Sequence, residues 1–171
     1  MKKLFTSVTQ TESTIIREWS DDESQGYFTG VMFDACEVFS ICDGVIVQVE
    51  KSTKYHKVVT IQYSNNLYVR YLNIIELDNE IVEGRTITFG QFIGKCYHNQ
   101  LMFEVCTKDG DKRWPVRIGK YTLYKEDPMT YLTDESTFHK HIDVSMFDDA
   151  EYNSNLAISN EEFDGNNRGE W

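Results

Sequence analysis

The stretch from Cys42 to Gly94 constrains the fold more than any other part of this 171-residue chain. Short runs rich in β-branched and aromatic residues alternate there with turn residues, as in VIVQVE after Asp43-Gly44. Runs of this length between such turns are typical of antiparallel strands. Glycines at positions 84, 90 and 94 then mark points where a small β domain bends sharply. The stretch therefore predicts an all-β fold, a compact antiparallel β-sandwich or barrel.

The expected strands continue on both sides of that stretch and divide the chain into three parts. Apolar runs at 27–33 and 38–42 precede it, and strands at 100–107 and a hairpin within 114–124 follow it. Residues 127–132 are expected to form one helical turn with a proline near its start. Residues 1–26 are predicted to be an irregular N-terminal arm, with a lone strand at 14–18 as the alternative. Residues 27–132 form the β domain, and residues 133–171 form an acidic C-terminal extension.

The C-terminal extension carries most of the chain's charge. It has ten acidic and two basic residues, so it supplies −8 of the net −11. Its apolar residues are spaced singly, and such a segment cannot bury enough surface to fold alone. It is either a disordered tail or an arm whose aromatic side chains anchor it to a neighbouring subunit. The candidate interaction anchors are Phe138, Phe147, Phe163 and Trp171.

The charge and the N-terminal sequence limit the partners and the location. A chain this acidic is a poor ligand for the phosphates of nucleic acid or for an anionic membrane surface. The start MKKLFTSVTQ has no apolar segment of the kind found in signal peptides, and no run is long enough to span a membrane. We therefore expect a protein that is made in the cytoplasm and binds neither nucleic acid nor membrane.

The cysteines and histidines show no metal-site spacing. Cys36, Cys42, Cys96 and Cys106 form no C-x-x-C pair and are predicted to be buried, reduced thiols, with a metal cluster including His56 or His98 as the alternative. His56 and His98 lie in expected turns and are predicted to be solvated. His139 and His141, with Asp143, would point the same way on an extended chain and could chelate a metal adventitiously.

Six landmarks occur in the order found in the LytM/lysostaphin-type peptidase domain, peptidase family M23, which residues 27–132 resemble. Residues 38–46 (VFSICDGVI) resemble its "V-Y-A-x-A-D-G-x-V", residues 57–63 its "N-x-V-x-I-x-H", and residues 67–72 its "T-x-Y-x-H-L". Residues 81–94 resemble its glycine-rich corner, residues 101–105 its "H-L-H-F-E-V", and residues 127–132 its closing "N-P-x-x-Y-L". The resemblance implies a compact antiparallel β fold. In active members this fold holds one zinc ion and cuts peptidoglycan cross-bridges.

The residues that would do this chemistry are replaced. Active members bind zinc through an "H-x-x-x-D" pair, which should fall near Ser24–Thr29, and through the second histidine of "H-x-H". The "H-x-H" pair aligns with Gln100 and Met102, and the histidines of "Y-x-H-L" and "I-x-H" align with Tyr71 and Tyr63. Zinc hydrolysis needs three ligands and an open coordination position. We therefore expect no metal, no cofactor and no catalytic residue.

The sequence favours a catalytically inactive M23-like domain that serves as a structural or protein-interaction module, most of all as a component of a bacteriophage virion or tail-like particle. Its partners would then be other subunits, bound through the terminal arms. Three alternatives remain. The first is a divergent zinc endopeptidase with relocated ligands, and the second is a peptidoglycan-binding module in which Tyr63, Tyr68, Tyr71 and Trp114 are exposed along the old cleft. The third is a biotinyl- or lipoyl-like carrier, for which the expected lysine is missing.

Overall fold

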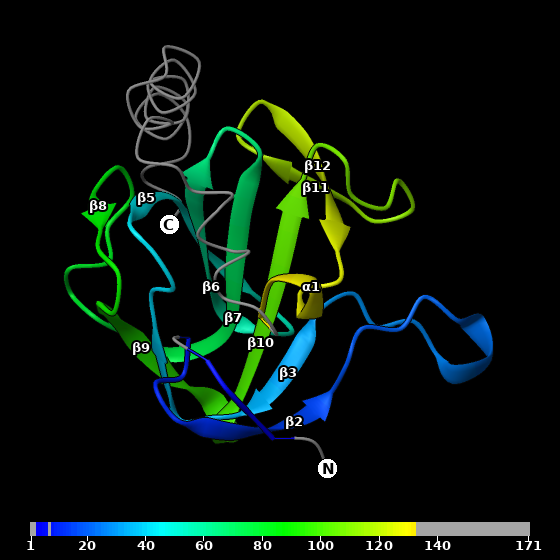
Figure 1. Ribbon diagram of the computed structural model, residues 1–171. Helices are drawn as coiled ribbons and strands as arrows, with labels where there is room; N and C mark the ends of the chain where they lie inside the picture. The colour runs from blue at the N-terminus through cyan, green and yellow to red at the C-terminus, as the bar shows by residue number, and fades with distance from the viewer. Residues whose placement is uncertain (1–2, 7, 133–171) are drawn as a thin grey trace.

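The computed structural model describes residues 3–6 and 8–132 of the chain. This part contains twelve β-strands, two 3-10 turns and one short α-helix (Figure 1). The strands are β1 (Lys3–Phe5), β2 (Glu12–Arg17), β3 (Val31–Asp34), β4 (Glu37–Phe39), β5 (Gly44–Ser52), β6 (His56–Ser64), β7 (Leu67–Leu77), β8 (Thr86–Ile87), β9 (Phe92–Cys96), β10 (Gln100–Thr107), β11 (Pro115–Ile118) and β12 (Tyr121–Glu126). The helical elements are η1 (Glu23–Gln25), η2 (Tyr97–Asn99) and α1 (Met129–Leu132).

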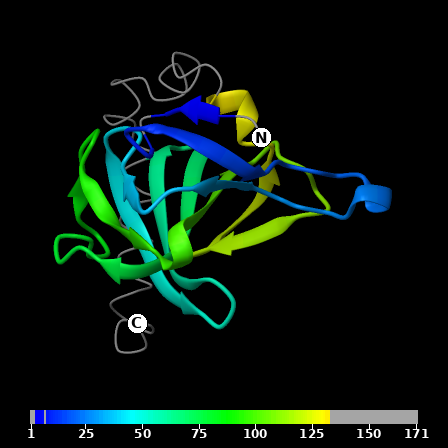
Figure 2. The same ribbon diagram turned by 90° about the horizontal axis from the view of Figure 1, so that it is seen from below.

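All strand pairs are antiparallel and join into one sheet. The main path runs β1-β2-β3-β10-β7-β6-β5-β8, with β12 and β11 branching from β10 and with β9 and β4 branching from β7. The path ends at β1 and β8 and does not close on itself, and Figure 2 shows how strongly the sheet curves. The predicted antiparallel all-β fold is therefore confirmed, in the form of an open curved sheet. In the described part of the chain, no helix is long and apolar enough to cross a membrane.

The central strands β6, β7 and β10 carry apolar side chains on both faces. One face, which we call the core face, holds the largest cluster, including Ile61, Val69 and Phe103. The other, which we call the second face, carries two smaller clusters, one around Tyr68 and Cys106 and one that includes Met102. Neighbouring residues of a strand point to opposite faces. Strands buried on both sides lose the simple polar–apolar alternation, which explains the nearly continuous apolar runs in the sequence.

The glycine corner expected at residues 81–94 is present. Gly84 has φ of 87°, a conformation that other residues adopt only with strain. At Gly94 the backbone of β9 lies so close to β7 that an added Cβ would overlap the carbonyl oxygen of Glu76. These two positions need glycine for different reasons, one for its dihedral angles and one for the close approach of two strands.

The N-terminal arm is more regular than predicted. The strand expected at 14–18 exists as β2, but it is not a lone strand, because it pairs with β1 on one side and β3 on the other. The serine- and threonine-rich composition suggested irregular structure because such residues compete for backbone hydrogen bonds. Here Thr9 Oγ1 donates to the Thr11 carbonyl at 2.9 Å, while Ile15 alternates into the core. The arm therefore extends the sheet along β3.

Strand β7 runs past Asn73 to Leu77 with one irregularity. Asn73 takes a left-handed conformation with φ of 72°, and its side-chain amide donates to the carbonyls of Tyr97 and Gln100 at 3.0 and 2.7 Å. The strand resumes beyond Asn73 and pairs with β9. The helical turn expected near the end of the β domain is present as α1. The anchors Phe138, Phe147, Phe163 and Trp171 lie outside the described residues.

Candidate functional site

Two segments that the resemblance assigns to metal binding meet on the second face of the sheet. Phe28, from the range expected to hold the first ligand pair, is 7% exposed, and Met102 is 3% exposed. Both belong to one apolar cluster, which Val58 and Leu72 complete. A phenyl ring offers no donor atom to a metal, and a thioether is a soft ligand unsuited to a zinc hydrolase. These residues do not fit a zinc ion.

The aspartate nearest to this range in the sequence is Asp22, which has a structural role. Its Oδ1 accepts hydrogen bonds from the backbone N–H of Ser24 at 2.9 Å and from the Ser24 hydroxyl at 2.8 Å. These bonds cap η1 and lower the pKa of Asp22 below its usual value. The Asp22 side chain is exposed on the loop between β2 and β3, where it serves as the N-cap of η1.

A buried ion network occupies the next position of β10 on the second face. Glu104 is 1% exposed, and its two carboxylate oxygens bind Arg70 Nη1 at 2.8 Å and Lys125 Nζ at 2.7 Å. Arg70 also reaches Glu50 at 3.3 Å. Both oxygens of this one buried carboxylate therefore accept hydrogen bonds from cationic side chains. Glu104 therefore accepts hydrogen bonds and is not placed as a free general acid.

Two buried polar side chains on β6 lie in line with this network. Thr60 pairs with Arg70 across the β6–β7 ladder, and Gln62 pairs with Tyr68. Both are fully buried, and within the described residues the Thr60 hydroxyl and the Gln62 amide have no hydrogen-bond partner. Buried polar groups without partners are rare in folded proteins. The sequence gives no signal for this feature, because Thr60 and Gln62 look like the outward positions of an alternating strand.

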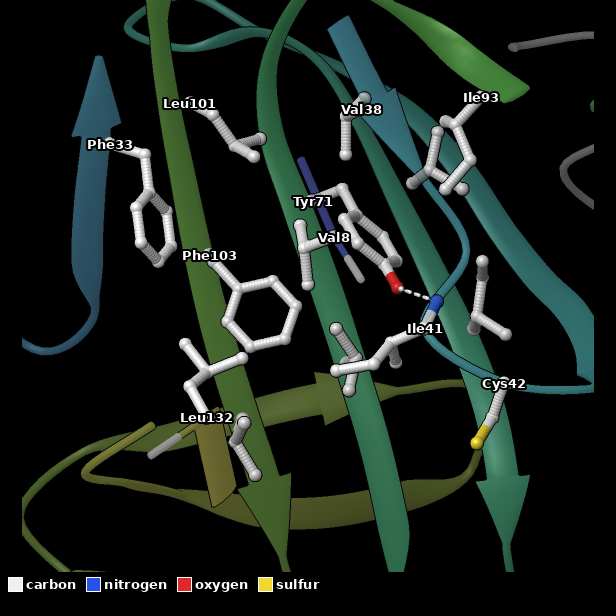
Figure 3. Close-up of a cluster of buried hydrophobic side chains, with 14 of the residues drawn as sticks. Val8, Phe33, Val38, Ile41, Cys42, Tyr71, Ile93, Leu101, Phe103 and Leu132 are labelled. Atoms are coloured by element: carbon white, nitrogen blue, oxygen red, sulfur yellow. Dashed lines mark hydrogen bonds between the residues drawn. The ribbon is translucent and has the colours of Figure 1, made fainter. Parts of the chain in front are cut away.

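Tyr63 and Tyr71 lie on the opposite side, in the main core, where Figure 3 shows Tyr71. Their hydroxyls are 2.6 Å apart, the Tyr63 hydroxyl lies 2.8 Å from Ser40 Oγ, and the Tyr71 hydroxyl accepts from the N–H of Ile41 at 3.4 Å. Burial is the main cause that raises the pKa of both phenols well above 10. They are hydrogen-bonded core tyrosines that stay protonated at neutral pH.

Gln100 is exposed at the first position of β10, at the edge of the molecule. Its carbonyl accepts the Asn73 amide, and its backbone pairs with Asp34 of β3. The four positions that align with the family histidines are therefore distributed over three environments, namely the core, the second-face cluster and the surface. The structure brings Tyr63 to Tyr71, and Met102 to Phe28, but it does not bring all four together.

A family profile for peptidase family M23 matches residues 26–113, just over half of the chain. The chain belongs to peptidase family M23. A comparison with curated proteins found no match.

Several solved structures share the M23 fold of this chain. The structure of the SpoIIQ–SpoIIIAH pore-forming complex matches with a TM-score of 0.57 and 16% identity over 82% of this chain and 98% of the other. Csd3 of Helicobacter pylori matches with a TM-score of 0.56 and 21% identity, and lysostaphin with 0.55 and 18%. These two matches cover 73% and 71% of this chain, but only 33% of the Csd3 chain and 50% of the lysostaphin chain. At these identities the comparisons establish the fold.

The histidines of this M23 chain are not arranged as a metal site within the described residues. His56 and His98 both flank the ring of Tyr97, with centroid distances of 4.2 and 3.9 Å. Among the residues described, no three His, Cys, Asp or Glu side chains are grouped to hold a metal ion. The sequence predicted both histidines to lie in turns. His98 does lie in the turn η2, but His56 is half-buried and is the first residue of β6, so that prediction was wrong for His56. The sequence gave no indication that the two histidines share one aromatic neighbour. His139, His141 and Asp143 lie outside the described residues.

The aromatic cleft expected for a peptidoglycan-binding module is absent from the described surface. Tyr63, Tyr68 and Tyr71 were expected to be exposed, but they are 0%, 2% and 0% exposed. That expectation was wrong because β6 and β7 are covered on both faces. Trp114 is half-buried and makes an edge contact with Tyr27, with centroids 5.0 Å apart. This contact joins the β2–β3 loop to the β10–β11 loop.

Proposed function

We propose that this chain is a catalytically inactive M23 domain that acts as a structural and protein-interaction module. The observation that carries the proposal is the apolar cluster of Phe28 and Met102 at the positions expected to hold zinc ligands. The tyrosines aligned with the other family histidines are buried, protonated and bonded to each other. A zinc-bound hydroxide needs ligands and solvent access together, and neither group of residues offers both.

A groove on the described surface suits a protein partner. Val49 and Leu77 lie half-buried at its floor, and Lys51 and Lys57 lie directly opposite each other across the β5–β6 ladder. Like charges placed opposite each other destabilise a sheet unless an anion lies between them. Within the described residues, neither lysine has a carboxylate in ion-pair range. The groove therefore presents an apolar floor and two lysines that have no ion-pair partner among the described residues, beside Glu50, which pairs with Arg70.

The acidic extension has the complementary chemistry. Its singly spaced apolar residues and its net charge of −8 match a groove with an apolar floor and a basic rim. We assign the groove to residues 133–171 of a neighbouring copy, with Phe138, Phe147, Phe163 and Trp171 as the candidate anchors. The shared fold with a chain of the SpoIIQ–SpoIIIAH complex supports the view that an M23 domain can serve in a protein assembly.

We also propose that the chain is a component of a bacteriophage virion or a tail-like particle. It follows from the expectation that the chain combines an M23 scaffold without its metal ligands with arms that bind other subunits. Mass spectrometry of particles purified from the source, with and without protease treatment, tests it. The chain should co-purify with the particle at a fixed ratio to the major structural protein. Its presence only in the unassembled fraction would contradict the particle assignment.

The inactive state has its own test. Purified full-length chain, supplied with zinc and then dialysed, is assayed for bound metal and for the release of fragments from isolated peptidoglycan, with an active M23 enzyme as positive control. We expect less than one-tenth of an equivalent of zinc and no release. Stoichiometric zinc with chelator-sensitive release would favour the divergent endopeptidase. Retention of the chain on peptidoglycan without any release would favour the wall-binding alternative.

A further inference from the structure

Cys36 and Cys96 are a cross-strand pair of thiols at the end of the β4–β9 ladder. The register of that ladder pairs Glu37 with Lys95 and Val38 with Gly94, so Cys36 and Cys96 are the next residues outward. The backbone N–H of Cys96 donates to the carbonyl of Cys36 at 2.7 Å, which continues the ladder by one step. The two cysteines are therefore direct neighbours across the sheet, although they are far apart in the sequence.

The side chains of this pair point to the same face. Cys36 lies at the bend directly before β4 and opposite Cys96, and opposite residues of an antiparallel pair carry their side chains on the same face. Cys96 is buried in the same core cluster. Opposite residues that are hydrogen-bonded in an antiparallel ladder have Cα atoms about 5.5 Å apart. Disulfides bridge Cα separations of about 4.4–6.8 Å, so the Cα spacing typical of such a pair lies within that range.

The two thiols differ in access. Cys36 is exposed, contrary to the expectation that all four thiols are buried, and it lines a surface hollow between residues 9–14 and residues 34–39. Cys96 is 5% exposed, and burial, together with the nearby Cys36, raises its pKa to about 12. A small disulfide can therefore reach Cys36 but not Cys96.

We propose that Cys36 and Cys96 form an intramolecular disulfide by exchange with a low-molecular-weight disulfide such as oxidised glutathione. The Cys36 thiolate attacks one glutathione sulfur, which breaks the glutathione disulfide, forms a mixed disulfide and releases one glutathione thiolate. The Cys96 thiol then loses its proton to solvent and attacks Cys36 Sγ. The second glutathione thiolate leaves, so one oxidised glutathione has become two reduced ones.

This disulfide would close a loop that contains β4 to β8 and most of β9. A crosslink that closes a long loop stabilises a fold chiefly by restricting the unfolded chain. The inference is independent of the proposed inactive state, because none of the positions aligned with the family histidines takes part. It assigns a modification site that would stabilise the domain wherever the surroundings are oxidising.

The test incubates the full-length chain with oxidised glutathione, then counts free thiols in denaturant and maps the disulfides by peptide mass spectrometry. We expect the four thiols to fall to two, a Cys36–Cys96 peptide pair, and a higher thermal midpoint than for the reduced chain. Cys36→Ser, at an exposed position, should fold normally, keep three thiols and show no rise in the midpoint. Cys106→Ala, at a buried site away from the pair, should still form the link.

Three results would overturn the inference. The first is that all four thiols persist under conditions that oxidise a reference dithiol. The second is that Cys36 stops at the mixed disulfide even at pH 9, where attack by Cys96 is faster. The third is that Cys36 instead links two chains. That result would show that Cys36 reacts because it is exposed, and not because Cys96 lies opposite it.

Discussion

The hydroxyls of Tyr63 and Tyr71 lie 2.6 Å apart inside the core, on the opposite face of the sheet from Met102. Both tyrosines align with family histidines, yet Tyr71 is paired in the ladder with Phe103, whose ring it meets edge-on at 5.4 Å. Ser40 and the Ile41 N–H complete the network. The pair therefore links β6 and β7 to the segment between β4 and β5.

Removal of one hydroxyl from this pair should destabilise the fold. Tyr71→Phe leaves the Ile41 N–H without its acceptor and the Tyr63 hydroxyl without one of its partners, at an expected cost of about 1–2 kcal/mol in unfolding free energy. Urea denaturation measures this cost, with Tyr97→Phe at an exposed ring as the matched control. The double variant Tyr63→Phe/Tyr71→Phe should cost less than the sum of the two single changes. Strict additivity would show that the hydroxyls do not interact.

The buried phenols and thiols make stability depend on alkaline pH. Burial raises the pKa of Tyr63 and Tyr71 above 10, and it raises the pKa of Cys96 and Cys106 from 9.0 to about 12. The folded chain then keeps protons that the unfolded chain releases. The stabilisation is complete below about pH 9, and it decreases as the pH rises from there towards the folded pKa values.

The slope should reach about 1.4 kcal/mol per pH unit for each group that titrates only in the unfolded chain. Urea denaturation at pH 8–11 under reducing conditions measures it. Tyr63→Phe/Tyr71→Phe should flatten the part above pH 10 and leave the part between pH 9 and 10 unchanged. An unchanged slope in this variant above pH 10 would contradict the assignment to these phenols.

The Glu104 network allows a comparison of buried and exposed ion pairs in one chain. Glu104→Gln leaves Lys125 and Arg70 without their buried counter-ion, and we expect a loss of about 3 kcal/mol. Glu80→Gln breaks the exposed pair with Arg85 and should change stability by less than about 0.5 kcal/mol. Chemical denaturation of the two variants, side by side, measures the difference. Equal effects would mean that water screens Glu104 as well as it screens Glu80.

Local rules predicted much of this fold, and long-range pairing decided the rest. Gly84 and Gly94 could be identified as corners from the sequence. The positive φ of Gly84 is a local property that favours glycine, and the spacing of the glycines marks the close approach at Gly94. The faces of Tyr71 and Met102 could not be predicted, because they depend on which residues pair across β7 and β10 and on irregularities such as the one between Lys57 and Val59. A match in motif order shows which residue aligns with each family position, but it does not show on which face of the sheet that residue's side chain lies.

The same limit explains the two cysteines and the N-terminal strand. Nothing in the spacing of Cys36 and Cys96 indicates a pair, because β4 and β9 meet only through the fold. Similarly, the β-branched residues of β2 allowed a strand there, but its place in the sheet depends on its pairing with β3, which the sequence does not show. At the candidate site, the loss of metal ligands could be predicted residue by residue. The packing of Phe28 into the cluster of Met102 could not, since it requires the β2–β3 loop to fold back onto the sheet.

The lysine groove makes the interaction proposal testable on the full-length chain. A mixture of isotope-labelled and unlabelled chains is treated with a carbodiimide, which joins lysine amines to carboxylates in direct contact. We expect labelled–unlabelled crosslinks from residues 133–171 to Lys51 and Lys57, and a several-fold loss of them in Lys51→Glu/Lys57→Glu. Because the attraction is electrostatic at an exposed rim, 0.5 M salt should weaken it as well.

Lys112 and Lys120 are the matched controls, since they are exposed on the β10–β11 loop and the β11–β12 turn, away from the groove. Lys112→Glu/Lys120→Glu should leave the crosslinks to Lys51 and Lys57 unchanged. Crosslinks within single chains only would restrict the extension to its own domain and exclude the neighbouring copy. Crosslinks spread evenly over all exposed lysines would mean that the extension has no preferred surface. The apolar floor formed by Val49 and Leu77 would then have to serve a different partner.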